Sequence, residues 1–339
     1  MRKIIYPVLV GLILLIAFFL RFYKLTSDPP SLNWDEVSIG YNAYSILKTG
    51  RDEWGQLLPV HFKSYGEYKL PAQIYASIPG IAVFGLNELG VRITPVIYGT
   101  LTILLLYFLT KKIFENEWIA LVASFLLAIS PWHIQLTRAS FESSFSVFWV
   151  TLGAWLFIKG FTNKKYWFWS IVPFVISIYT YNATRVFTPL FLIALLLIYR
   201  RDILKNTKIW VLSLLVFLVS MIPLASFVIS GEATARLKLV SIIDDPGFAL
   251  RINEARGNTR LPEPLPRLIH NKITHYVYVF VGNYLSHFTP DFLFISGAGH
   301  KQQHVQGIGE LYMVQAPFIL VGLYFLFRKK NKWRWLLIS

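Results

Sequence analysis

Long apolar runs with basic flanks are the dominant pattern along this chain. A helix needs roughly 20 apolar residues to cross a bilayer of about 30 Å. Eight runs are candidates for such helices: residues 4–22, 88–110, 117–131, 142–159, 166–181, 186–199, 209–230 and 311–327. The third, fifth and sixth are short, which indicates tilted, extended or bundle-buried helices. The pattern predicts an all-α protein that crosses a membrane several times.

Two more polar segments interrupt the apolar pattern. In the first, residues 23–86, apolar and aromatic positions from Trp34 to Leu47 recur at helical spacing and end at Gly50. This spacing predicts a helix lying on the membrane interface. A second helix of the same kind is expected over residues 71–84.

The second polar segment covers residues 231–310. Asp244 to Gly247 has the composition of a turn, residues 261–266 are proline-rich and expected to be extended, and residues 271–288 are expected to be helical. The predicted organisation is a catalytic transmembrane module over residues 1–230, an outer loop region over 231–310, and a last part over 311–339. That last part holds one complete span and the start of a ninth, so we expect a fragment or a naturally shortened member of a larger family.

Charge placement predicts the orientation in the membrane. The net charge is +15, and 16 of the 33 lysines and arginines lie in short clusters beside the apolar runs. Such clusters mark cytoplasmic loops, so the N-terminus is expected in the cytoplasm and the two polar segments outside. A nucleic-acid partner is excluded by where the basic residues lie. The run after Met1 has no small-residue cleavage site, which indicates a retained anchor, and the absence of cysteine excludes disulfides.

Two adjacent acids, Asp35 and Glu36, follow the first apolar run in the sequence Asn33-Trp34-Asp35-Glu36. Carboxylates are costly to keep beside a membrane, so they indicate chemistry there. Capping of the following helix is the alternative interpretation. Adjacent side chains diverge by about 100° on a helix, so one acid can face a cavity while the other caps. We favour Asp35 as the catalytic carboxylate and keep Glu36 as the second catalytic candidate.

A second charged pair, Glu67 and Lys69, precedes Pro71. Residues two apart on an extended segment face the same way. The ammonium could hold a phosphate and the carboxylate a divalent metal ion, whereas an exposed ion pair is the plain alternative. Glu67 is therefore the candidate metal ligand.

Two arginines are further candidates to bind phosphate. Arg138 lies one helical turn before Glu142, with which it could pair. Arg185 follows Tyr181 and Asn182 between two short spans, at the expected outer mouth of the bundle. A planar guanidinium suits phosphate well, although either arginine could instead serve a helix end or the lipid interface.

Histidines give a weaker signal. His300 and His304 have a metal-ligand spacing, but the glycines and glutamines around them indicate a loop. His133 is expected to be an interface residue.

The ordered set of motifs resembles the polyprenyl-phosphate-dependent glycosyltransferases of the C-type membrane fold. It is most similar to family 39, which contains protein O-mannosyltransferases and lipid A aminoarabinose transferases. The resemblance rests on Asn33 to Glu36, Glu67 to Pro71, Phe84 to Arg92, Ser130 to Glu142 and Tyr179 to Arg185, with Gly307 to Tyr312 further on.

The resemblance implies a hexosyl or pentosyl transferase in the plasma or inner membrane, with its active site on the outer face. Its donor would be a polyprenyl-phosphate sugar, its acceptor a protein, lipid or glycan, and a divalent metal ion could assist. Asp35 would act as base, and Lys69, Arg138 and Arg185 would bind the donor phosphate. Trp34, Tyr65, Tyr181 and Asn182 would line the sugar pocket. A lipid-linked sugar transporter or flippase, or an inactive scaffold, are the rival interpretations.

Overall fold

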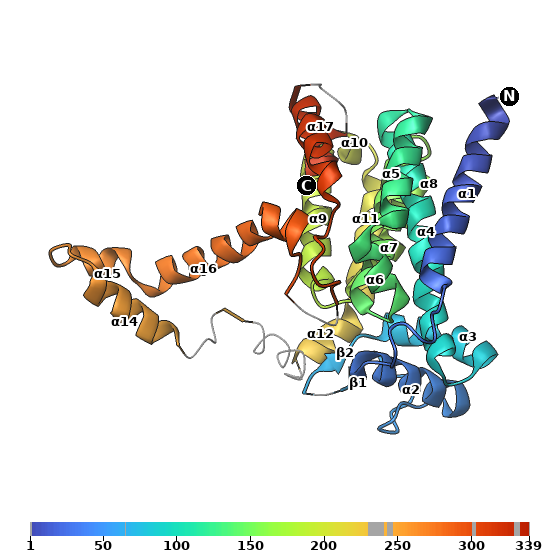
Figure 1. The fold of residues 1–339 in the computed structure, drawn as a ribbon, viewed down its shortest axis with the longest axis horizontal. Helices are drawn as coiled ribbons and strands as arrows, with labels where there is room; N and C mark the ends of the chain where they lie inside the picture. Colours follow the sequence, from blue (N-terminus) through green and yellow to red (C-terminus); the bar gives the residue numbers. More distant parts are fainter. Residues whose placement is uncertain are drawn as a thin grey trace.

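The protein is a bundle of apolar helices capped at one end by a small polar layer (Figure 1). The computed structural model describes residues 2–64, 66–229, 241–242, 247–299, 303–328 and 333–338. Each of the eight predicted apolar runs forms helix over most of its described length, and the all-α class is confirmed. The bundle helices are α1 (Arg2–Phe22), α4 (Glu88–Phe114), α5 (Glu117–Ile129), α6 (Pro131–Arg138), α7 (Glu142–Gly160), α8 (Lys165–Ile178), α9 (Thr184–Ile198), α10 (Arg200–Leu204), α11 (Thr207–Ser220), α12 (Ile222–Ile229) and α17 (Ala316–Arg328).

Within the described residues, three helices are long and apolar enough to cross a membrane: Ile4–Phe22, Glu88–Phe114 and Thr207–Ile229. The pair α5 and α6 adds a fourth if it is one broken span, bent by 56°. The bend lies at Pro131, and Ser130 before it is extended, with ψ of 128°. Proline disfavours helical backbone in the preceding residue, which explains the break.

The end of the bundle far from the polar layer has an aromatic core. Trp167 of α8 and Phe157 of α7 are buried there, together with Tyr199. Trp333 before α18 (Arg334–Ile338) is buried against Phe161 and Tyr199, with ring centroids 5.1 and 5.8 Å apart. The residues predicted to start a ninth span therefore fold back onto the bundle.

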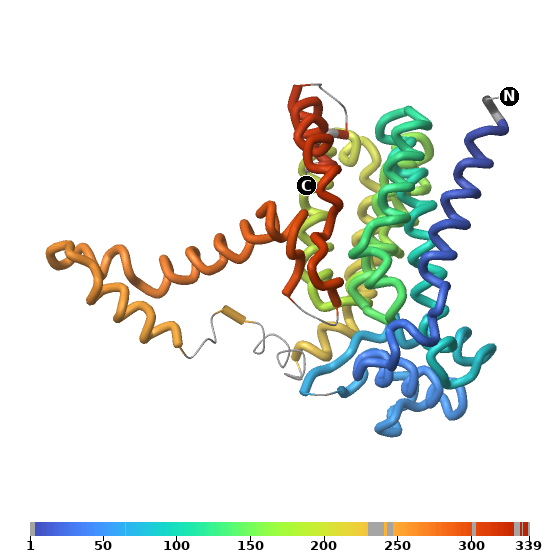
Figure 2. The backbone as a smooth tube through the Cα atoms, in the orientation of Figure 1, coloured from blue at the N-terminus to red at the C-terminus, as the bar shows by residue number. Residues whose placement is uncertain are grey.

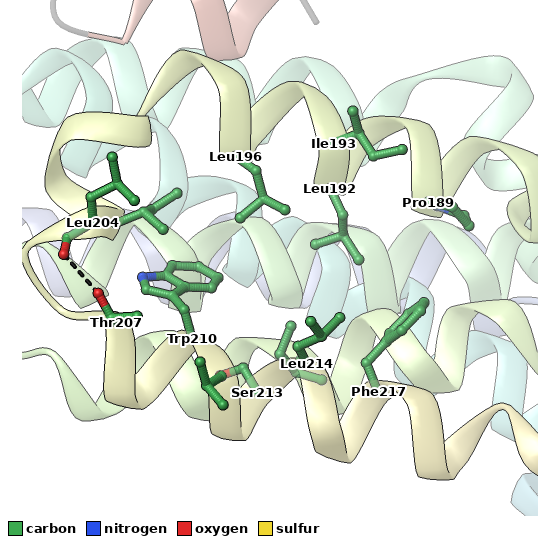
Figure 3. Close-up of a pocket in the computed structure, with 13 residues that line it drawn as sticks. Pro189, Leu192, Ile193, Leu196, Leu204, Thr207, Trp210, Ser213, Leu214 and Phe217 are labelled. Atoms are coloured by element: carbon green, nitrogen blue, oxygen red, sulfur yellow. Dashed lines mark hydrogen bonds between the residues drawn. The ribbon is translucent and has the colours of Figure 1, made fainter.

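A largely apolar pocket of about 370 Å³ lies between α9 and α11 (Figure 3). Leu192 and Leu196 of α9 face Trp210 and Phe217 of α11 across it.

The polar layer is built from the first predicted outer segment. It comprises α2 (Trp34–Thr49), α3 (Pro71–Phe84), and a hairpin of β1 (Phe62–Lys63) and β2 (Tyr68–Lys69), at the end of the bundle opposite the N-terminus (Figure 1). The two helices predicted here are confirmed. Asn33 caps α2, and Gly50 ends it in the left-handed conformation with φ of 69°, which glycine adopts without steric cost.

The second predicted outer segment forms an arm that leaves the bundle sideways (Figure 2). It contains α14 (Phe248–Asn258), α15 (Leu265–Ile269) and α16 (Lys272–Ser286). The π-helix η1 (Asp291–Ile295) and the 3-10 helix η2 (Met313–Gln315) lead back to α17. The helix predicted over 271–288 is confirmed as α16, and the stretch 261–266 runs into α15 instead of staying extended throughout. Residues 243–246, most of the predicted turn, lie outside the described residues.

Candidate functional site

A polar cavity of about 180 Å³ lies where the polar layer meets the bundle. Asp35 comes from the first turn of α2, and Glu67 and Lys69 come from the hairpin. The remaining lining residues come from the turn before α7 and the first residues of α7, the turn between α8 and α9, and the segment before α17: Ser140, Phe141, Glu142, Ser143, Tyr181, Asn182 and Gln303. Five segments far apart in the sequence therefore converge on one small space.

Lys69 and Asp35 form an ion pair in this cavity, with Nζ and Oδ1 2.5 Å apart. The ammonium is only 4% exposed, whereas the carboxylate is 26% exposed. Lys69 is held in place by the register of the hairpin, in which it pairs with Phe62. Glu67, two residues earlier, lines the same cavity.

Burial alone would lower the pKa of the Lys69 ammonium. The carboxylates of Glu142, Asp35 and Glu67, together with the hydrogen bond to Asp35, outweigh burial and raise the pKa of Lys69 above its ordinary value of 10.5. The cavity therefore keeps a buried, permanently charged cation among three acids at neutral pH.

Glu36 has a different environment from its neighbour Asp35. It is buried, and its carboxylate accepts hydrogen bonds from Arg92 Nε at 2.8 Å and Nη2 at 3.1 Å. It also accepts from the backbone N–H of Asn33 at 3.1 Å and of Ser140 at 3.2 Å. The Glu36 side chain is thus fully used in joining α2, α4 and the turn before α7, and Asp35 is the acid of the pair that lines the cavity.

Arg138 is directed toward the end of α1. Its Nη1 donates to the carbonyls of Leu20 at 2.9 Å and Tyr23 at 2.8 Å, and Nη2 donates to the carbonyl of Asp28 at 2.6 Å. The acid that it could have paired with, Glu142, lines the cavity. Arg138 therefore holds the segment leading to Asp35 and does not itself line the cavity.

Arg185 lies beside the cavity at the start of α9. Its guanidinium stacks over the ring of Phe227, 5.5 Å from the centroid, and Glu142 is close enough to interact electrostatically. Nε and Nη2 are buried, and neither has a hydrogen-bond partner in the described part of the chain. A buried donor without a partner is costly, so these atoms point to a ligand.

The predicted sugar pocket is brought together only in part. Tyr181 and Asn182 line the cavity, whereas Trp34 is 60% exposed and is absent from its lining. Tyr65 lies outside the described residues.

The sequence and the fold are both similar to those of known proteins. Residues 73–227 match the family described as dolichyl-phosphate-mannose-protein mannosyltransferase. The archaeal oligosaccharyltransferase AglB from Archaeoglobus fulgidus superposes over 98% of this chain and 46% of its own, with a TM-score of 0.56 and 16% identity. ArnT from Cupriavidus metallidurans superposes over 85% and 49%, with a TM-score of 0.53 and 15% identity. The chain has the fold of the C-type membrane glycosyltransferases.

Two relatives match this chain by sequence. An uncharacterised protein of Aquifex aeolicus is 29% identical over 214 residues, which are 62% of this chain and 42% of the relative. Dolichyl-phosphooligosaccharide-protein glycotransferase 2 of Pyrococcus furiosus is 27% identical over 175 residues, 49% of this chain and 23% of the relative. The chain spans less than half the length of the curated relatives that it matches.

The cavity lined by Asp35 does not fit a metal site. Asp35, Glu67 and Glu142 line it, but no three histidine or acidic side chains among the described residues converge on one position. The ammonium of Lys69 contacts Asp35 there instead. Of the histidine pair, His300 lies outside the described residues, and His304 contacts Glu310 at 3.2 Å. We derive no step through a metal.

The structure adds three buried polar residues that sequence reasoning missed. Arg92 holds Glu36, and Gln73 donates to the Ser140 hydroxyl at 2.8 Å. Arg21 donates to Thr137 and contacts His133 Nδ1 at 2.7 Å, so His133 is buried and not an interface residue. The one available signal was an arginine or glutamine inside an otherwise apolar helix.

Proposed function

We propose that the chain transfers a monosaccharide from a polyprenyl-phosphate donor to an acceptor hydroxyl at the outer face of a cell membrane, with inversion at the anomeric carbon. The observation that carries the proposal is the ion pair of the buried Lys69 with the partly exposed Asp35 in a polar cavity. Beside it lie the Nε and Nη2 of Arg185, which have no hydrogen-bond partner among the described residues. An anionic leaving group needs such cations, and an attacking hydroxyl needs such a carboxylate.

In the proposed reaction, the acceptor oxygen attacks the anomeric carbon as the bond from that carbon to the phosphate oxygen breaks. Asp35 takes the proton from the hydroxyl. The phosphate leaves with the bonding electrons, and the charge that it gains is balanced by Lys69 and Arg185. A single displacement of this kind inverts the anomeric configuration.

The outer location is supported by the distribution of charge. The basic helix α10 and the N-terminus lie at the end of the bundle opposite α2, α3 and the hairpin (Figure 1). Basic ends of membrane helices favour the cytoplasm, so the cavity end would face outward.

The apolar pocket between α9 and α11 could hold the lipid part of the donor. Pro189, which lines it, lies one helical turn beyond Arg185 on α9. A donor phosphate near Arg185 could therefore extend its isoprenoid chain along these helices. The described AglB complex contains a dolichol-phosphate and an inhibitory peptide, which supports a lipid-linked donor for this chain.

The test is Asp35→Asn in membranes supplied with labelled polyprenyl-phosphate sugars. We expect transfer to fall at least 100-fold, since a general base contributes roughly 10²–10⁴ in rate. Asp28→Asn is the matched control, because the Asp28 carboxylate is 76% exposed and lies 3.8 Å from Arg138; it should keep near-normal transfer. Near-normal transfer by Asp35→Asn would disprove the assignment, and donor crossing the membrane uncleaved would favour a transporter.

A further inference from the structure

A second cavity, of about 690 Å³ and lined by both aromatic and charged side chains, lies at the end of the bundle opposite Asp35. It is formed by the last turn of α4, the first turn of α5 and the connection between α7 and α8. Its charged lining consists of three lysines and two glutamates, and aromatic rings frame them. The proposed transfer reaction does not use any of these side chains.

One of the three lysines is neutralised locally. Lys111 Nζ lies 2.5 Å from Glu117, which also accepts a hydrogen bond from the Tyr107 hydroxyl. No ion pair joins Lys112 or Lys159 to a carboxylate among the residues that the structure describes. The cavity therefore has two cations available to an external anion.

Lys159 is fixed by aromatic rings and not by an acid. Its ammonium lies 4.4 Å from the ring centroid of Trp155, one turn earlier on α7, and 4.4 Å from that of Tyr166 on α8. Cation–π contacts position an ammonium without cancelling its charge. The site is thus ordered in advance and still positive.

We propose that this cavity binds the headgroup phosphate of one anionic phospholipid from the cytoplasmic leaflet, through Lys112 and Lys159. Anionic lipids are concentrated in that leaflet, and lysines with aromatic side chains are typical of the membrane interface. A volume of about 690 Å³ is in the range of small-ligand sites. The inference rests on the orientation proposed above and not on the transfer reaction, so failure of one leaves the other testable.

The experiment measures binding of phosphatidylglycerol to the full, delipidated chain in neutral detergent by native mass spectrometry. The variant Lys112→Gln/Lys159→Gln should bind about 30-fold more weakly, which is about 2 kcal/mol at 1.4 kcal/mol per tenfold. Lys112→Arg/Lys159→Arg keeps both charges and should bind within a few-fold of the wild type. Lys205→Gln/Lys208→Gln removes two charges near α10, outside the cavity lining, and should leave binding unchanged.

Equal weakening by both glutamine pairs would overturn the proposal in favour of diffuse surface attraction, and no weakening by the cavity pair would overturn it as well. Competition with inorganic phosphate distinguishes a lipid headgroup from free phosphate as the ligand. If inorganic phosphate displaces the lipid at equal concentration, the site recognises free phosphate and the lipid proposal fails. Normal elution of every variant from a sizing column, with an unchanged thermal midpoint in neutral lipid, confirms that folding is intact.

Discussion

Replacing Glu36 with glutamine tests whether this acid is structural. Each carboxylate oxygen accepts two hydrogen bonds: Oε1 from Arg92 Nε and the Ser140 N–H, and Oε2 from Arg92 Nη2 and the Asn33 N–H. A glutamine has only one acceptor oxygen, and its amide nitrogen is a donor. Whichever way the amide is turned, two of the four hydrogen bonds are lost. The amide nitrogen of the glutamine, itself a donor, then faces the two N–H donors that had bonded to the replaced oxygen.

The expected cost is about 3–5 kcal/mol in the free energy of unfolding, because the buried Arg92 guanidinium loses its counter-charge. Its remaining partners are the carbonyls of Leu25, Pro29 and Ser31, at 2.8–2.9 Å. Unfolding by SDS in mixed micelles, followed by tryptophan fluorescence, measures this change. Asp35→Asn is the matched control and should cost about 1 kcal/mol, since Asp35 is partly exposed and the carboxylates of Glu142 and Glu67 still act on Lys69.

The double variant Glu36→Gln/Arg92→Gln, together with the two single variants, completes a double-mutant cycle. It should cost less than the sum of the two single changes, because the second substitution removes the charge that the first leaves unpaired. If Glu36→Gln unfolds within about 0.5 kcal/mol of the wild type but loses transfer as fully as Asp35→Asn, the acid acts in the chemistry and the structural argument is refuted.

Two further predictions address charge and packing. The pKa of Lys69 is raised above 10.5, so the stability that its ammonium contributes is complete below that pH and is lost as pH rises through the folded-state pKa. Unfolding measured from neutral to strongly alkaline pH should show this loss in the wild type and lack it in Lys69→Met; identical profiles would contradict the assignment. Gly160→Ala should destabilise the chain by about 1–3 kcal/mol, because a Cβ there would lie 2.0 Å from Trp167. Gly11→Ala meets nothing within 4 Å and should not lower the thermal midpoint, so equal effects of the two changes would contradict the packing argument.

The bundle and the two capping helices could be predicted from the sequence because their signals are local. Apolar runs set the spans, Asn33 and Gly50 begin and end α2, and Pro71 begins α3. The alternation over Glu67 and Lys69 was likewise enough to predict that both side chains face one space, and both line the cavity.

The division of roles between neighbours could not be predicted. Asp35 and Glu36 are adjacent and chemically alike, and what separates them is Arg92, 56 residues away in sequence. Arg138 was a candidate phosphate ligand because a guanidinium suits phosphate, and Glu142 was its expected ion-pair partner. Its actual hydrogen-bond partners lie on the segment between α1 and α2, more than 100 residues earlier. Such contacts depend on how distant helices pack, which no local pattern contains.

The arginines around the cavity show how structural and ligand-binding cations can be distinguished here. Arg92 and Arg138 donate to carbonyls of the segment between α1 and α2, and so hold the chain that leads to Asp35. Arg185 alone of these three keeps buried donors without partners in the described part of the chain. A guanidinium whose donors are already used cannot also bind a phosphate without breaking bonds that position Asp35, the proposed general base. Of the predicted phosphate ligands, Lys69 and Arg185 therefore remain our candidates, and Arg138 is better understood as the residue that positions Asp35.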